Sequence, residues 1–314
     1  MRGLRVRQTA GHVALLLLWP VFCQGAEPGK PIKVFLLAGQ SNMQGQGVVE
    51  MDHPKYYNGG TGNLVWSMEH SASKDLMRHL RDDDGKWSER EDVTVRYKTK
   101  GNVRQGKLTV GYTGYGGSSH IGPELQFGHL VGDHFDEPVL LIKTAWGGKS
   151  LQVDFRPPSS PGETGPFDTQ MTAEIRTALD ELHGRPYELA GFVWMQGWNA
   201  MITQEATTEY ADNLVNLANA IRAEFESPTL PIVVGELGNG GPAKPGSGMA
   251  RFREAQKRGV ARIDHASFVV THRFARPAEL SPNTGHGHHW FGNAESYFLV
   301  GDALGKAMIE LIGQ

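Results

Sequence analysis

Two residues that can do chemistry together stand near opposite ends of this sequence, a serine and a histidine. Ser41 follows the apolar run Val34-Phe-Leu-Leu-Ala-Gly39, and His289 lies in Gly285-His-Gly-His-His-Trp-Phe-Gly-Asn293. The apolar run predicts a buried strand that delivers Ser41 to the mouth of a sheet, at the start of a helix or loop. There its backbone N–H is free to face an anion, and its hydroxyl requires a base. We predict that His289 is this base and that the pair performs acyl transfer.

Donors for a developing negative charge are expected after two further apolar runs. Gly147 and Gly148 follow the run 139–145, and paired glycines allow a backbone N–H to approach a ligand closely. We choose the N–H of Gly148, together with that of Ser41, for the oxyanion hole. Gln196 and Asn199 follow the run 189–195, and a buried carboxamide beside the reacting carbonyl can donate there as well. The sequence does not decide between these two carboxamides.

The sequence does not identify the group that would orient His289. Glu236 ends the run 231–235, where it is placed to orient a neighbouring histidine. A backbone carbonyl would serve equally in a Ser–His dyad, and another carboxylate is a third alternative. His286, His288 and His289 also raise the possibility of a metal site, but no Cys, Asp or Glu at ligand spacing accompanies them. We therefore expect no metal and no cofactor.

Aromatic residues gather in or beside the segments that follow the apolar runs. Exposed aromatic faces at such positions suit stacking on sugar rings, although burial is the usual fate of any one of them. The predicted substrate contacts are Gln40, Trp146, Trp198 and Trp290.

Strand and helix patterns alternate along the chain. Near-continuous apolar runs at 32–38, 139–145, 189–195, 231–235 and 267–271 predict five strands. Amphipathic patterns predict helices at 122–135, 167–183, 204–225, 249–263 and 295–312. This alternation is typical of a doubly wound parallel sheet in a three-layer α/β/α sandwich. Ligands in such folds bind beyond the carboxyl ends of the strands, where the candidate residues fall.

Residues 48–119 interrupt the alternation. This segment is polar and rich in Gly, Asp and Lys, with a short helix predicted near 74–81. It has too few apolar runs for a core of its own, so we interpret it as an insertion, part ordered and part lid, in a single domain that covers residues 27–314.

The N-terminus has the pattern of a cleaved secretory signal over residues 1–26. Arg2, Arg5 and Arg7 precede a short apolar stretch, and small residues end at Ala26. We therefore predict a secreted or periplasmic protein without a membrane span, whose mature chain lacks the single cysteine, Cys23. A net charge of −3 excludes the basic footprint of a nucleic-acid-binding protein. The sequence does not indicate an oligomeric state.

Gly39-Gln-Ser-Asn-Met43 resembles block I of the SGNH hydrolases, and more closely the start of the sialate O-acetylesterase and acetylxylan esterase branch (carbohydrate esterase family six). The serine is the nucleophile in that family, and the block around Gly147 and Gly148 contributes a glycine N–H to the oxyanion hole. Gln196-Gly197 resembles its His-Gln-Gly-Glu signature, and Gly197-Trp-Asn199 resembles block III of the superfamily. The chain departs from these patterns at Met195, Trp198 and Ala200 and has His286 where the superfamily places an aspartate.

The resemblance implies a serine esterase that removes O-acetyl groups from carbohydrate, of sialate or hemicellulose type, through an acetyl-serine intermediate. Two alternatives remain. One is a non-catalytic carbohydrate-binding protein on the same fold, which the missing acid would explain, and the other is an esterase for lipid or aryl esters.

Overall fold

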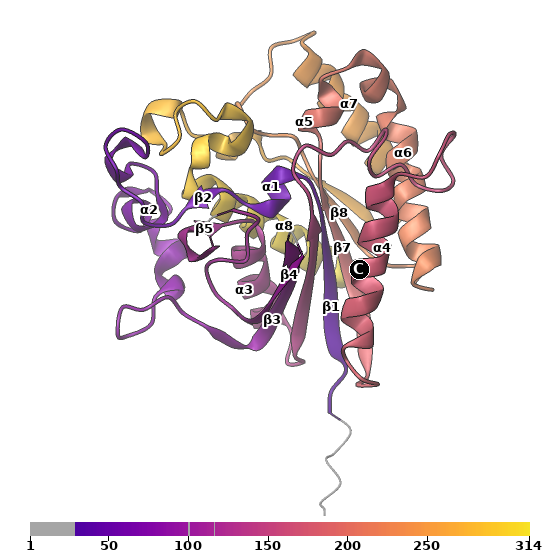
Figure 1. Ribbon diagram of the computed structural model, residues 1–314, viewed down its shortest axis with the longest axis horizontal. Helices are drawn as coiled ribbons and strands as arrows, with labels where there is room; N and C mark the ends of the chain where they lie inside the picture. The colour runs from indigo at the N-terminus through magenta and orange to yellow at the C-terminus, as the bar shows by residue number, and fades with distance from the viewer. Residues whose placement is uncertain (1–28, 100, 116) are drawn as a thin grey trace, which may run out of the picture.

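A seven-stranded sheet runs through the centre of the computed structural model, which describes residues 29–99, 101–115 and 117–314 (Figure 1). The strand order is β4-β3-β6-β1-β7-β8-β9. All neighbouring strands are parallel except β3 and β4, which form an antiparallel pair at one edge. The predicted signal segment 1–26 lies outside the described residues.

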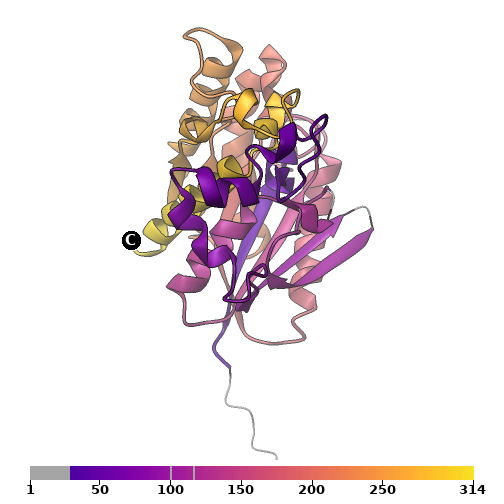
Figure 2. The same ribbon diagram turned by 90° about the vertical axis from the view of Figure 1, so that its left-hand side faces the viewer.

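The five predicted strands all lie in this sheet. Their bounds are β1 Ile32–Gly39, β6 Val139–Ala145, β7 Tyr187–Met195, β8 Ile232–Gly235 and β9 Ala266–Val269. The expected count of five is too low, because β3 (Arg90–Thr99) and β4 (Asn102–Leu108) extend the sheet from within the segment interpreted as an insertion. Figure 2 shows this hairpin projecting from the side of the sheet.

Helices cover both faces of the sheet, which confirms the three-layer architecture (Figure 1). Helices α3 (Glu124–His134) and α8 (Ala294–Ile312) pack together over one face. The other face carries α4 (Pro166–Asp180), α6 (Gln204–Glu224) and α7 (Gly248–Val260). Side chains of β1 alternate between the two cores, as the two-residue period of a strand requires: Phe35 and Leu37 join one, Val34 and Leu36 the other.

Shorter elements complete the chain. Helices α1 (Ser41–Gln44) and α5 (Trp198–Met201) begin beyond the ends of β1 and β7. Strands β2 (Gly47–Val48) and β5 (His120–Ile121) form a small antiparallel ladder, and α2 (Leu64–His70) lies between them in the chain. The short helix predicted near 74–81 is a 3-10 helix, Lys74–Leu80. Five more 3-10 turns occur in the described residues, at Asn58–Gly60, Gly117–Ser119, His272–Phe274, Ala278–Leu280 and Gly287–Gly292. In the described part of the chain, no helix is both long and apolar enough to cross a membrane.

Strand β1 lies at the point where the strand order reverses. It pairs with β6 on one side and with β7 on the other, so Gly39 lies opposite both Ala145 and Met195. Such a switch point opens a crevice beyond the carboxyl ends of the strands, where ligands of doubly wound folds bind. Ser41 begins the helix that follows this point.

Candidate active site

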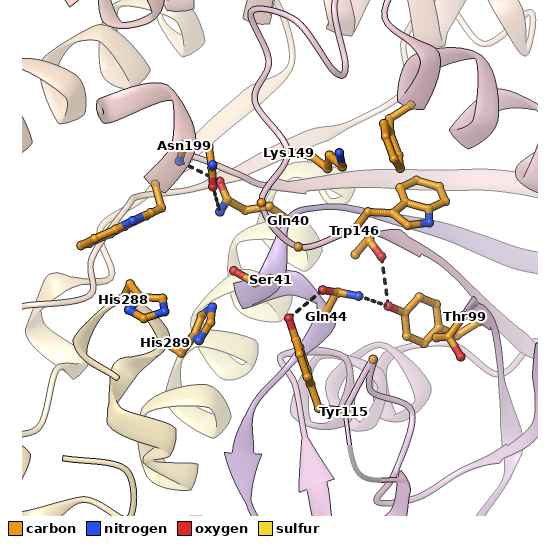
Figure 3. A pocket seen from close by; sticks show the side chains of 17 residues that line it. Gln40, Ser41, Gln44, Thr99, Tyr115, Trp146, Lys149, Asn199, His288 and His289 are labelled. Carbon is orange, nitrogen blue, oxygen red and sulfur yellow. Dashed lines mark hydrogen bonds between the residues drawn. The ribbon is translucent and has the colours of Figure 1, made fainter. Parts of the chain in front are cut away.

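A pocket of about 520 Å³ lies over the carboxyl ends of β1, β6 and β7 (Figure 3). This volume falls in the usual range for small-molecule sites. Seven of the residues that the sequence singles out line it together: Gln40, Ser41, Trp146, Gly148, Trp198, Asn199 and His289. They come from segments far apart in the chain, and the parallel sheet brings them to one edge.

Ser41 owes its position to a tight turn after β1. Gly39 has φ +149°, and a Cβ atom there would lie 2.1 Å from the carbonyl oxygen of Met195, so only glycine fits. The strand ends are joined here by hydrogen bonds from Trp146 N to Gly39 O and from Gln40 N to Met195 O. Within the described residues, neither the hydroxyl nor the backbone N–H of Ser41 has a hydrogen-bond partner. Both groups are therefore available to a ligand.

A hydrogen-bond chain sets the orientation of the Asn199 carboxamide. The N–H of Gly197, which can only donate, is 3.0 Å from Oε1 of Gln40. The other end of this amide, Nε2, therefore donates to Oδ1 of Asn199, at 3.2 Å. Nδ2 of Asn199 is thus left as a donor, and no acceptor for it occurs in the described chain (Figure 3). Gln40 acts here through Asn199, a role that the sequence did not indicate.

Gly147 and Gly148 form the wall of the pocket beside Ser41. A Cβ atom on Gly147 would lie 2.9 Å from both Gln44 Oε1 and Tyr115 Oη and 3.6 Å from Ser41 Cβ, so glycine permits this close approach. Gly148 has φ +73° and open space around it. The backbone N–H groups of both glycines lack acceptors among the described residues. Either N–H can thus serve a ligand, and the choice of Gly148 stays a prediction.

His289 lies on a strained loop at the rim of the pocket (Figure 3). Trp290 and Phe291, the next two residues, have φ of 53° and 54°, a left-handed conformation that is costly for such side chains. The loop is held by hydrogen bonds from Asn42 Nδ2 to His288 O, at 3.2 Å, and from Tyr297 Oη to Asn42 Oδ1, at 3.0 Å. Asn42 therefore connects the turn that carries Ser41 to residues 285–293, the histidine loop.

The ring of His289 is surrounded by other rings. Its centroid is 4.0 Å from that of His288, and no carboxylate or carbonyl in the described residues accepts a hydrogen bond from it. Burial, with the nearby His288 and His286, lowers the pKa of His289 to about 3. The imidazole is therefore neutral at pH 7 and able to accept a proton. No group of three or more His, Cys, Asp or Glu in the described chain is arranged to hold a metal ion.

Comparison with known proteins agrees with this arrangement. Residues 31–310 match the model of a family described as carbohydrate esterase, sialic acid-specific acetylesterase. The chain belongs to this family. Membership makes it a carboxylic ester hydrolase, a carbohydrate O-acetylesterase, and confirms the resemblance noted from the sequence.

Individual relatives of this esterase are distant. A curated Arabidopsis thaliana protein named a probable carbohydrate esterase is 23% identical over 218 residues, which cover 68% of this chain and 72% of that protein. An X-ray structure of an Arabidopsis thaliana protein has the same fold, with a TM-score of 0.59 at 15% identity over 90% of this chain and 99% of that one. A carbohydrate acetylesterase from Xanthomonas citri superposes with a TM-score of 0.53 at 16% identity, over 88% of this chain but only 55% of its own. The esterase thus spans about half of the Xanthomonas chain.

Glu236 of the esterase does not contact His289. Its Oε2 accepts hydrogen bonds from His272 Nδ1, at 2.8 Å, and from the backbone N–H groups of Thr271 and His272, both at 3.0 Å. This corrects the prediction of Glu236 as the orienting acid, because the histidine that it orients is His272. The carboxylate was correctly placed beside a histidine at a strand end, but the loop after β9 supplies that histidine.

Two further predictions are corrected by burial and hydrogen bonding. Gln196 donates both amide hydrogens, to Gln40 Oε1 and to Lys149 O, and lies beside a separate hollow of about 10 Å³, so it is no oxyanion donor. Trp290 is 2% exposed and points into the core, so it cannot stack on substrate. The sequence places Trp290 directly after His289, but it does not indicate that the indole is buried.

The segment interpreted as an insertion contributes to the pocket. Tyr97, Thr99 and Tyr115 line it, and Gln44 joins the two tyrosines, since its Nε2 donates to Tyr97 Oη and its Oε1 accepts from Tyr115 Oη. Sequence reasoning missed these residues. The alternation of Val93, Val95 and Tyr97 with polar residues was the available signal for a strand that would bring them there.

Proposed function

We propose that the chain is a serine esterase that hydrolyses O-acetyl groups on carbohydrate, of sialate or hemicellulose type, through an acetyl-serine intermediate. One observation carries the proposal: a hydroxyl, a neutral imidazole and unpaired N–H donors line the same pocket. These are the three components that acyl transfer requires. Aromatic rings of Trp146 and Trp198 in the same pocket suit a sugar ring.

In the first step, Ser41 Oγ attacks the acetyl carbonyl while His289 accepts the hydroxyl proton. The oxyanion that forms accepts hydrogen bonds from the N–H groups of Ser41 and Gly148 and from Nδ2 of Asn199. Collapse of this intermediate breaks the ester C–O bond, and the protonated His289 gives its proton to the sugar oxygen. The products are the free sugar hydroxyl and acetyl-Ser41.

Water then attacks the acetyl carbonyl while His289 accepts a proton from the water. The protonated His289 gives that proton to Ser41 Oγ as the bond between Oγ and the acetyl group breaks. Acetate leaves, and the hydroxyl of Ser41 is restored. Because His289 has no carboxylate partner in the described chain, we propose a Ser–His dyad. We further propose that residues 1–26 are removed as a secretory signal and that residues 27–314 form one exported domain.

The test is acetate release from p-nitrophenyl acetate, acetylated xylan and O-acetylated sialic acid. Ser41→Ala is expected to lower kcat by a factor on the order of 10³ or more. Ser227→Ala, a partly exposed serine before β8, is the matched control and should match wild type. A mass shift of one acetyl group on the peptide that contains Ser41 in the quenched wild-type reaction would identify the intermediate. Full activity of Ser41→Ala would contradict the mechanism.

A further inference from the structure

A second hollow lies on the other side of the histidine loop. Its volume is about 420 Å³, and it is lined by residues 55–57 and 283–286. His286 lines this hollow, while His288 and His289 line the candidate active site. The ring centroids of His286 and His288 are only 5.8 Å apart, so one short loop separates the two hollows.

The walls of the second hollow are held in place by local bonds. Asn58 Nδ2 donates to the carbonyl oxygens of Glu279 and Ser281, both at 3.1 Å, which ties the loop before α2 to the chain before the histidine loop. Asn283 N donates to Phe291 O at 2.7 Å. Figure 1 and Figure 2 show these two parts of the chain side by side. The hollow is thus formed before any ligand arrives.

Its lining combines an exposed aromatic ring with uncommitted polar groups. Tyr56 is 60% exposed, although its ring is steadied by that of His53 at a centroid distance of 4.9 Å. The side chains of Asn283 and Thr284 have no hydrogen-bond or ion-pair partner in the described chain, and the Lys55 ammonium lies over the Tyr56 ring, 5.1 Å from its centroid. An exposed aromatic ring beside unpaired amide and hydroxyl groups is the combination that a sugar ring requires, since the sugar's C–H face stacks on the ring and its hydroxyls form hydrogen bonds.

We propose that this hollow is a second carbohydrate subsite, which binds a pyranose ring of the glycan that carries the acetylated residue. The proposal rests on the proposed function, because the acetylated residue itself would occupy the pocket at Ser41. The glycan chain then crosses the histidine loop, with the C–H face of the flanking sugar on Tyr56. The subsite thus makes the enzyme selective for oligosaccharides over free monosaccharides.

The experiment compares matched substrates in wild type, Tyr56→Ala and a control. O-acetylated sialyllactose is compared with O-acetylated sialic acid, acetylated xylo-oligosaccharides with acetylated xylose, and p-nitrophenyl acetate reports the chemistry alone. Wild type should prefer the oligosaccharide of the pair that it hydrolyses. Tyr56→Ala should lower kcat/KM for that oligosaccharide by roughly tenfold, the scale of one lost stacking contact. Tyr187→Ala, a tyrosine 45% exposed at the far end of the sheet, should change nothing.

Calorimetry on the Ser41→Ala background separates this proposal from the proposed function. Binding of the same oligosaccharide to Ser41→Ala should weaken by a similar factor when Tyr56→Ala is added. If Ser41→Ala keeps full activity, the mechanism fails while this binding comparison still reports on the subsite. Equal losses on oligosaccharide and monosaccharide, no wild-type preference, or unchanged affinity would each overturn the subsite.

Discussion

At the scale of single residues, His289 has unusual surroundings for a base. Its neighbours are the rings of His288, His286 and Tyr115, at centroid distances of 4.0, 6.4 and 6.4 Å. Burial keeps the imidazole neutral, whereas a carboxylate would also stabilise the imidazolium that forms during the reaction. His289 therefore stays unprotonated in acid, but it is a weaker base toward the serine proton.

This environment predicts an acid-tolerant esterase. A base with its pKa lowered from 6.5 to about 3 loses activity only when the pH falls toward that lowered value. The acid limb of kcat/KM for p-nitrophenyl acetate should thus lie below the value of an ordinary histidine. His286→Asp, which places a carboxylate near His289, should raise the pKa of His289 and shift the acid limb to higher pH. A wild-type limb at 6.5 or above would contradict the prediction.

Asn199 is predicted to act on the transition state and not on substrate binding. Asn199→Ala removes the donor that Gln40 orients, and kcat should fall by about 10²–10³ with little change in KM. Asn219→Ala, an exposed asparagine on α6, is the matched control. Steady-state kinetics on p-nitrophenyl acetate measure both. A rise in KM at constant kcat would place Asn199 in ground-state binding instead.

At the scale of elements, the turn between β1 and α1 determines where the nucleophile lies. Three strands end together here, and Gly39 packs directly against the backbone of β7. The main chain therefore approaches more closely than any side chain would allow. Ser41 takes its place from this contact between strands.

Gly39→Ala tests that contact against a matched glycine. Gly184 also has a positive φ, +80°, but a Cβ atom there has open space within 4 Å, so Gly184→Ala should cost only about 1–2 kcal/mol of unfolding free energy. Gly39→Ala adds a steric clash with Met195 and should cost more, about 3 kcal/mol or above. Urea denaturation of both variants, with activity measured on the folded fraction, makes the comparison. Equal costs would show that the turn can relax.

At the scale of the whole molecule, Lys143 connects three parts of the fold. From β6, its ammonium donates to Glu124 Oε2 on α3 at 2.7 Å, to Gln44 O on α1 at 3.0 Å and to Tyr112 O at 2.7 Å. The side chains of Lys143 and Glu124 are 0% and 1% exposed. Helices α1 and α3 and the segment after β4 are thus all bound to one buried ammonium on the sheet.

Lys143→Met should therefore destabilise the fold strongly. It leaves Glu124 buried without its cation, and the expected loss of unfolding free energy is about 3–5 kcal/mol. Lys143→Met combined with Glu124→Gln should lose less than the sum of the single variants, since neither charge then remains unpaired. Lys306→Met removes an exposed pair with Asp302 and should cost at most about 1 kcal/mol. Additive losses in the double variant would argue against a coupled pair.

Much of the fold was predictable because local patterns determine strands and helices. Helix α6 was expected at 204–225 and spans Gln204–Glu224, and β6 was predicted to the residue. Strand β3 was missed because the strands were expected as near-continuous apolar runs, whereas its buried Val93, Val95 and Tyr97 alternate with polar and charged residues. Its place in the sheet depends on pairing with β6, a contact between distant segments that no local pattern records.

The candidate site, too, was predictable only in part. The sequence alone indicates that Ser41, Gly148 and Asn199 follow apolar runs, and parallel strands bring such ends to one edge. His289 follows no apolar run, and its segment before α8 reaches that edge through the tertiary fold. The tertiary structure was needed to show that Glu236 pairs with His272, that Gln196 donates to Gln40 Oε1 and Lys149 O, and that Trp290 points into the core. The reason is the short reach of a hydrogen bond: a side chain's partner depends on how neighbouring loops cross, which strand and helix periodicity leaves undetermined.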